Sequence, residues 1–262
     1  MNNFLYYYIQ TSIFQNKLKS VVNQSAQGGV YLNSLKKLNI KLTSDLSEQT
    51  KIASFLSTID KKIELLEQKH ENYENLKKYL MQHIFTQKLR FDYEFIKLKE
   101  ISKINKGKQL NKDAMIDDGE FYVLNGGQEP SGYTNEWNTP ENTITISEGG
   151  NSCGFVNFNE EKFWSGGHCY FLSDLDNQID TYYLYCYLKF KEKHIMCLRV
   201  GSGLPNIQKR DIENFKVQLL SKQDQNMISK LLWSADKKID SLKSQKDNFK
   251  KFKQGLLQQM FV

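Results

Sequence analysis

The chain has 262 residues, of which 39% are hydrophobic and 13% aromatic, which favours a packed core and argues against disorder. Its formal net charge of +6 allows a nucleic acid or a membrane surface as partner without establishing either. No stretch reaches the roughly 18 apolar residues that span a membrane, the N-terminus lacks signal-peptide features, and the four cysteines lack zinc-ligand spacing; we therefore expect a cytoplasmic protein with free thiols, no metal site and no membrane partner.

The first 46 residues are similar to a later part of the same chain. Residues 24–42 align with residues 201–219 at an offset of 177, and the aromatic run at 4–9 is similar to the one at 182–188. Such self-similarity is the mark of a duplicated structural unit. We therefore predict that residues 1–46 are the tail of a domain whose complete version is residues 87–222.

Residues 47–86 and 223–262 are each predicted to form one long helix. Within them, residues 48–85 align with 224–261 without a gap, with 13 identities in 38 positions. Apolar side chains recur every seven residues in both copies, which is the coiled-coil pattern. The two stripes are therefore predicted to pack on each other as antiparallel helices. The predicted helix-pairing residues are Ile52, Leu56, Ile59, Ile63, Leu66, Tyr73, Leu80, Ile228, Leu232, Ala235, Ile239, Leu242, Phe249 and Leu256.

Basic side chains interrupt both stripes at equivalent places. His70 corresponds to Lys246, and Lys77 corresponds to Lys253. We interpret them as part of a solvated face, with loosened pairing or fixation of the helix register as the alternatives.

Residues 87–222 contain short β-type runs separated by turn signals. Glycine pairs punctuate them, and glycine permits tight turns and close backbone approach. Residues 180–198 are predicted to form an aromatic-rich helix. This pattern favours a curved, β-rich sheet with a few helices, so the fold class is α+β. The predicted runs are residues 120–127, 142–150, 154–158, 168–175 and 214–220.

The sequence contains no motif of a known catalytic centre. It lacks the phosphate-binding loop, the HExxH zinc motif, the GxSxG elbow and a tetrad that would hold a target adenine. A nucleophile pair of His168 and Cys169 is conceivable, but neighbours on one strand point to opposite faces and would not meet. We therefore predict no catalytic residues.

Basic and amide side chains gather on the loops of residues 87–222, although the net charge of residues 86–223 is −2. Lysine and arginine can follow a phosphate backbone, and asparagine and glutamine can read adenine. Solvated surface and ordinary turn chemistry remain the alternatives. The predicted DNA-contacting residues are Lys106, Lys108, Gln109, Asn125, Gln128, Tyr133, Asn151, Ser152, Arg199, Ser202, Asn206, Gln208 and Lys209.

Taken together, these segments resemble the specificity subunits of type I restriction-modification systems. The strings EQTKIASFLSTIDKKIELLEQK and LKKYLMQHIF resemble the spacer helix of that family, as does the second copy ending in KQGLLQQMF. The stretches VLNGGQEPSGYTNEW and GSGLPNIQKRDIENFKV resemble parts of its target-recognition domain. The resemblance covers nearly the whole chain.

The resemblance implies a non-catalytic subunit that directs other subunits to a specific site on double-stranded DNA. Methyltransferase subunits would carry S-adenosylmethionine, and restriction subunits would use ATP and Mg, with no cofactor in this chain. Most of a first recognition domain is missing, so we expect a half-subunit that pairs with a second copy, a product of a rearranged gene, or a fragment. Two other classes stay open: a coiled-coil assembly protein whose domain binds protein, and an enzyme with a cryptic site.

Overall fold

The computed structural model describes residues 2–22, 29–40, 42–201, 203 and 205–261. Two compact units divide the chain: Met1–Asn75 with Lys237–Val262 form unit 1, and Leu76–Asp236 form unit 2. The predicted α+β class with two long antiparallel helices is confirmed. Within the described ranges, no helix is both long and apolar enough to cross a membrane.

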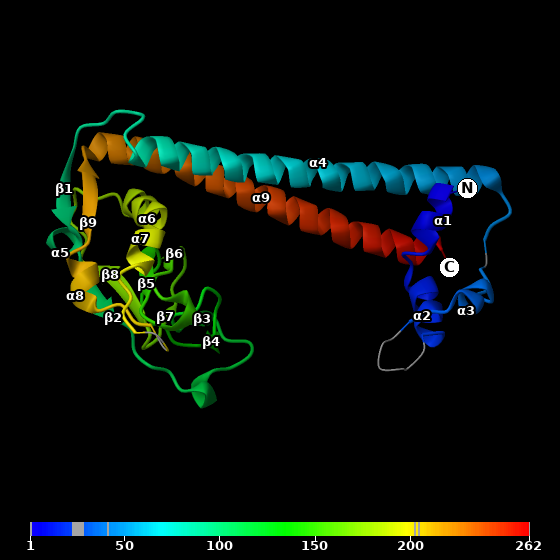
Figure 1. The fold of residues 1–262 in the computed structure, drawn as a ribbon, viewed down its shortest axis with the longest axis horizontal. Helices are drawn as coiled ribbons and strands as arrows, with labels where there is room; N and C mark the ends of the chain where they lie inside the picture. Colours follow the sequence, from blue (N-terminus) through cyan, green and yellow to red (C-terminus); the bar gives the residue numbers. More distant parts are fainter. Residues whose placement is uncertain (1, 23–28, 41, 202, 204, 262) are drawn as a thin grey trace. The chain divides into compact units, whose positions relative to one another are not determined.

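The two long helices are α4 (Leu46–Phe85) and α9 (Lys222–Met260), drawn in cyan and orange to red in Figure 1. Each contributes residues to both units. In unit 1, Lys253 Nζ lies 2.7 Å from Asp60 Oδ1, and Lys250 Nζ lies 2.8 Å from Glu67 Oε1. Residue numbers rise along α4 as they fall along α9, so the helices run antiparallel there.

The helix-pairing residues of the prediction lie on the buried sides of α4 and α9. Those that are buried are Leu56, Ile59, Ile63, Leu66, Ile228, Leu232, Ala235 and Leu242. Those that are half-buried are Ile52, Tyr73, Leu80, Ile239, Phe249 and Leu256.

The interpretation of two stripe lysines as solvated is wrong. The side chains of Lys77 and Lys253 are only 18% and 15% exposed, and both form ion pairs with aspartates. An antiparallel partner brings an acidic side chain within reach of each lysine, a pairing that a single-helix pattern does not reveal.

Three short helices complete unit 1: α1 (Asn2–Tyr8), α2 (Ser12–Ser20) and α3 (Leu32–Lys36). The α2 helix begins where Thr11 Oγ1 accepts a hydrogen bond from the Phe14 backbone N–H, which satisfies one of its unpaired amides. Aromatic rings join α1 to the end of α9, since the ring of Phe261 lies 5.0 Å from that of Phe4 and 5.9 Å from that of Tyr8.

Unit 2 contains three small sheets. The largest has the order β2-β8-β5-β6 and is antiparallel throughout, the second is β4-β3-β7 with a parallel β3–β7 pair, and the third is the antiparallel pair β1-β9. Alternating apolar residues bury one face of each strand. The strands are β1 (Tyr93–Lys97), β2 (Lys103–Lys106), β3 (Phe121–Leu124), β4 (Gly132–Thr134), β5 (Thr143–Ser147), β6 (Val156–Asn159), β7 (Trp164–Ser165), β8 (Cys169–Ser173) and β9 (Lys216–Leu220).

The core of unit 2 forms around the aromatic helix α6 (Thr181–Phe190). Asp180 caps it by accepting a hydrogen bond from the Tyr183 backbone N–H at 2.8 Å. The rings of Tyr183 and Tyr187 lie 5.9 and 5.5 Å from that of Phe85, and burial raises the pKa of Tyr187 to about 12. The remaining helices are α5 (Leu98–Ile101), α7 (Glu192–Met196) and α8 (Lys209–Glu213), with single 3-10 turns at Lys112–Ala114 and Gly150–Ser152.

Candidate nucleic-acid interface

Loops from five parts of unit 2 are joined by backbone hydrogen bonds at one end of the four-stranded sheet. The Gly107 N–H donates to Cys169 O, and the Glu148 N–H donates to His168 O, both at 2.9 Å. The Ile207 N–H in turn donates to Glu148 O at 2.9 Å. We call this set the loop cluster; it comprises residues 106–109, 125–126, 147–153, 165–168 and the described part of 199–209.

Close backbone approach within the loop cluster requires glycine at two positions. Gly126 has φ +81°, and a Cβ atom there would lie 2.5 Å from His168 O. A Cβ atom on Gly107 would lie 2.3 Å from Gly166 O. Any larger residue would force the neighbouring loops apart, because real Cβ atoms do not approach an oxygen so closely. The loops are thus held as one packed surface.

The carboxylate of Glu148 lies beneath this surface. The residue is 5% exposed, and its Oε1 accepts hydrogen bonds from Lys106 Nζ at 2.7 Å and from the Tyr170 hydroxyl at 3.0 Å. His168 Nδ1 lies 3.7 Å from Oε2. Burial, followed by the bond to Glu148, raises the pKa of Tyr170, which therefore stays a neutral donor. The carboxylate consequently fixes the position of a lysine on the surface.

Most of the predicted DNA-contacting residues lie in or beside the loop cluster. Those with exposed side chains are Lys106, Lys108, Gln109, Asn151, Arg199, Gln208 and Lys209, and those that are half-buried are Asn125, Ser152 and Asn206.

Three predicted residues lie elsewhere. Gln128 is exposed in the turn between β3 and β4, and Tyr133, 43% exposed, lies on β4. Tyr133 lines an open groove of about 670 Å³ with Met115 and Ile116. Ser202 falls outside the described residues. These placements leave the assignment of DNA contacts a prediction.

The sequence did not reveal Glu148 and Tyr170 as the residues that organise the loop cluster. Glu148 follows a β-type run and precedes two glycines, so its local pattern indicates an exposed turn. His168 and Cys169 are not a nucleophile pair: Cys169 is buried, and burial raises its thiol pKa to about 11, whereas His168 is exposed. Within the described residues, no group of three or more His, Cys, Asp or Glu side chains has an arrangement suited to a metal ion.

Comparison with known proteins relates nearly the whole chain to one family. The sequence profile described as the type I restriction modification DNA specificity domain matches residues 1–75 and 91–250. A type I specificity subunit of Mycoplasma genitalium is 26% identical over 271 residues, which cover 98% of this chain and 70% of that protein. Another, from Mycoplasma pneumoniae, is 36% identical over 147 residues, covering 55% of this chain and 39% of that protein. The chain thus matches only part of the length of each relative.

Solved structures show the same fold. The type I restriction-modification S subunit from M. genitalium superposes with a TM-score of 0.80 at 25% identity, covering 99% of this chain and 72% of that one. The HsdS subunit from Thermoanaerobacter tengcongensis gives a TM-score of 0.53 at 17% identity, covering 99% of this chain and 69% of that one, which shows likeness of fold alone.

Proposed function

Since the chain belongs to the type I restriction-modification DNA specificity family, we propose that it reads a DNA sequence on behalf of a restriction-modification complex. Family membership confirms the prediction of a non-catalytic subunit. It also favours this function over the coiled-coil assembly protein, for which no comparison gives support.

The observation that carries the proposal is the loop cluster, which presents cations and amides on one packed surface. Exposed lysines and Arg199 can contact phosphates, which gives affinity without sequence preference. Gln109, Asn206 and Gln208 can form paired hydrogen bonds with adenine, which gives discrimination. The hydrogen-bonded loops hold both kinds of side chain in place before DNA arrives, so little ordering entropy is lost on binding.

The family implies assembly with DNA and with methyltransferase subunits. We propose in addition that S-adenosylmethionine is held by the methyltransferase subunit, and that restriction subunits with ATP and Mg join the complex. A symmetrical homodimer would present two recognition domains, and its target would then be palindromic, because a two-fold assembly reads two equal half-sites.

Methylation mapping tests the proposal most directly. The chain is co-expressed with its cognate methyltransferase subunit, and methylated positions are located across the genome. We expect one methylated sequence motif that is absent without the chain and is changed or lost when Gln109, Asn206 and Gln208 are replaced with alanine. Gln223→Ala, an exposed position on α9, is the matched control. A motif that persists without the chain would contradict the proposal.

A further inference from the structure

Unit 1 repeats the closing segment of unit 2, with a different environment for its apolar side chains. At the repeat offset of 177, α3 (Leu32–Lys36) corresponds residue by residue to α8 (Lys209–Glu213). Val30, Leu35 and Ile40 are 40%, 43% and 40% exposed, whereas their equivalents Ile207, Ile212 and Val217 are 0%, 1% and 1% exposed. The same pattern of side chains is thus covered in one unit and uncovered in the other.

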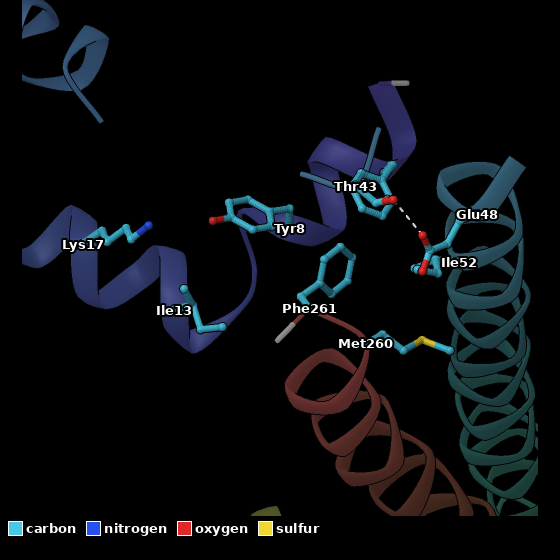
Figure 2. A pocket seen from close by; sticks show the side chains of 9 residues that line it. Tyr8, Ile13, Lys17, Thr43, Glu48, Ile52, Met260 and Phe261 are labelled. Carbon is cyan, nitrogen blue, oxygen red and sulfur yellow. Dashed lines mark hydrogen bonds between the residues drawn. The ribbon is translucent and has the colours of Figure 1, made fainter. Parts of the chain in front are cut away.

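A cavity of about 200 Å³ opens in unit 1 beside these residues (Figure 2). Aromatic and aliphatic side chains from α1, α2, α4 and the end of α9 line it, among them Tyr8, Ile13, Ile52 and Phe261. Ile13 is 38% exposed. Lys17, at the cavity wall, donates from Nζ to Asn39 O at 3.1 Å, which brings the stretch after α3 to the rim.

In unit 2 the equivalent space is filled. The counterparts of Tyr8 and Phe261 are Tyr183 and Phe85, whose rings lie 5.9 Å apart, as the rings of Tyr8 and Phe261 do. The counterpart of Ile13 is Leu188, which is 0% exposed.

The segment that fills this space in unit 2 is β1 followed by α5 (Tyr93–Ile101). Leu98 shares a small apolar cavity wall with Leu188 and Ile212, the counterparts of the exposed Ile13 and Leu35. The Leu98 N–H donates to Phe215 O at 2.9 Å, and Ile96 lies opposite Val217 in the β1–β9 pair. Within the described residues of unit 1, no strand or helical turn takes this place.

We propose that unit 1 binds a segment with the chemistry of Tyr93–Ile101: an extended strand, then one helical turn carrying two inward aliphatic side chains. The binding surface, here called the tail face, consists of the cavity together with Ile13, Val30, Leu35 and Ile40. The occupant is the corresponding segment of a recognition-domain body on a second polypeptide. Burying these aliphatic side chains supplies the driving force, as it does in unit 2.

A peptide of this chain's own residues 91–104 serves as the probe, labelled for fluorescence anisotropy and titrated with the full chain. We expect saturable binding of one peptide per chain. The double variant Ile13→Asp and Leu35→Asp weakens it roughly tenfold or more, because a charge would then lie against apolar surface. Both positions are exposed, so the variant still folds. Leu231→Asp, at an exposed α9 position in unit 2, is the matched control and leaves binding unchanged.

A peptide with Leu98→Asp and Ile101→Asp provides the second control and does not bind. Absence of binding by the natural peptide, or binding that is unaffected by the tail-face variant, would overturn the proposal. Self-association of the chain that the tail-face variant abolishes but the peptide does not compete with would assign the surface to another element of a second copy, and would equally overturn it. The assay contains no DNA, so its outcome is independent of the proposed DNA reading.

Discussion

Lys77 Nζ lies 2.5 and 2.7 Å from the two carboxylate oxygens of Asp236, an ion pair that joins α4 to α9 within unit 2. The same pair recurs 176 positions away with the roles of the helices exchanged, where Lys253 Nζ lies 2.7 Å from Asp60 Oδ1. The duplication in sequence is therefore also a duplication of contacts.

A tyrosine completes each ion pair. The Tyr7 hydroxyl donates to Asp60 Oδ2 at 2.9 Å, and the Tyr182 hydroxyl donates to Asp236 Oδ2. Burial, and then the bond to Asp60, raises the pKa of Tyr7 to about 12; burial likewise raises the pKa of Tyr182. These tyrosines place α1 in unit 1 at the position that α6 occupies in unit 2.

We expect Lys77→Met to destabilise unit 2 by about 1–3 kcal/mol, because a half-buried aspartate then loses its cation. Denaturation followed through Trp233, whose ring lies 4.7 Å from that of Tyr182, measures the change. Adding Asp236→Asn should restore most of the loss. An unchanged midpoint in the single variant would mean that the pair contributes nothing.

Replacing Leu66 and Leu242 with aspartate should unfold the helix pair of unit 1. Both side chains are buried, at 3% and 2% exposure, and each substitution buries an unpaired charge. Circular dichroism and solubility measure the effect. Leu65→Asp, at a 53% exposed position, is the control and should melt like the parent chain. Normal melting of the double variant would refute the pairing of these residues.

Lys106→Ala should weaken binding to target and scrambled duplexes alike, and lower the salt dependence of binding by about one unit of slope. The cause is loss of one phosphate contact from the loop cluster. Isotherms in rising salt, with methyltransferase subunit present, give the slope. Lys103→Ala is the control, since Lys103 lies at the opposite end of β2 and pairs with Asp174. Equal slopes for all three proteins would remove Lys106 from the interface.

Gln208→Ala should cost about 1–3 kcal/mol on the target duplex and little on random DNA, as expected for a base-reading amide. Gln208 precedes α8 without a side-chain capping bond, so its removal leaves the helix intact. Competition between the two duplexes measures the ratio of affinities. A loss shared by both duplexes would reassign Gln208 to phosphate contact.

Thiol reactivity should separate the cysteines by burial. Cys197 is exposed, whereas Cys153, Cys169 and Cys186 are buried. Burial raises the pKa of Cys169 to about 11 and that of Cys186 to about 12, so both stay protonated and unreactive at mildly alkaline pH. Thiol titration of the native chain at mildly alkaline pH should show one fast group, lost in Cys197→Ser, and denaturation should expose the rest. Several fast groups in the native chain would contradict the burial.

The sequence by itself determined the parts of the protein whose signal is periodic and local. Apolar residues every seven positions predicted both long helices, and the alternation around residues 121–124, 143–147 and 169–173 predicted β3, β5 and β8. The internal repeat also predicted that one closing segment exists twice. Each of these signals depends on backbone periods that neighbouring residues share.

Tertiary structure decided what depends on partners distant in sequence. The short strand β1 pairs with β9 more than a hundred residues later, and nothing in its five residues specifies that pairing. Glu148 is buried because Lys106 and Tyr170 reach it from other strands, although its own neighbours indicate a turn. Lys77 meets Asp236 only because two antiparallel helices bring those turns together. A buried charge is tolerated only where its partner is supplied in space, and that partner cannot be identified from the local sequence.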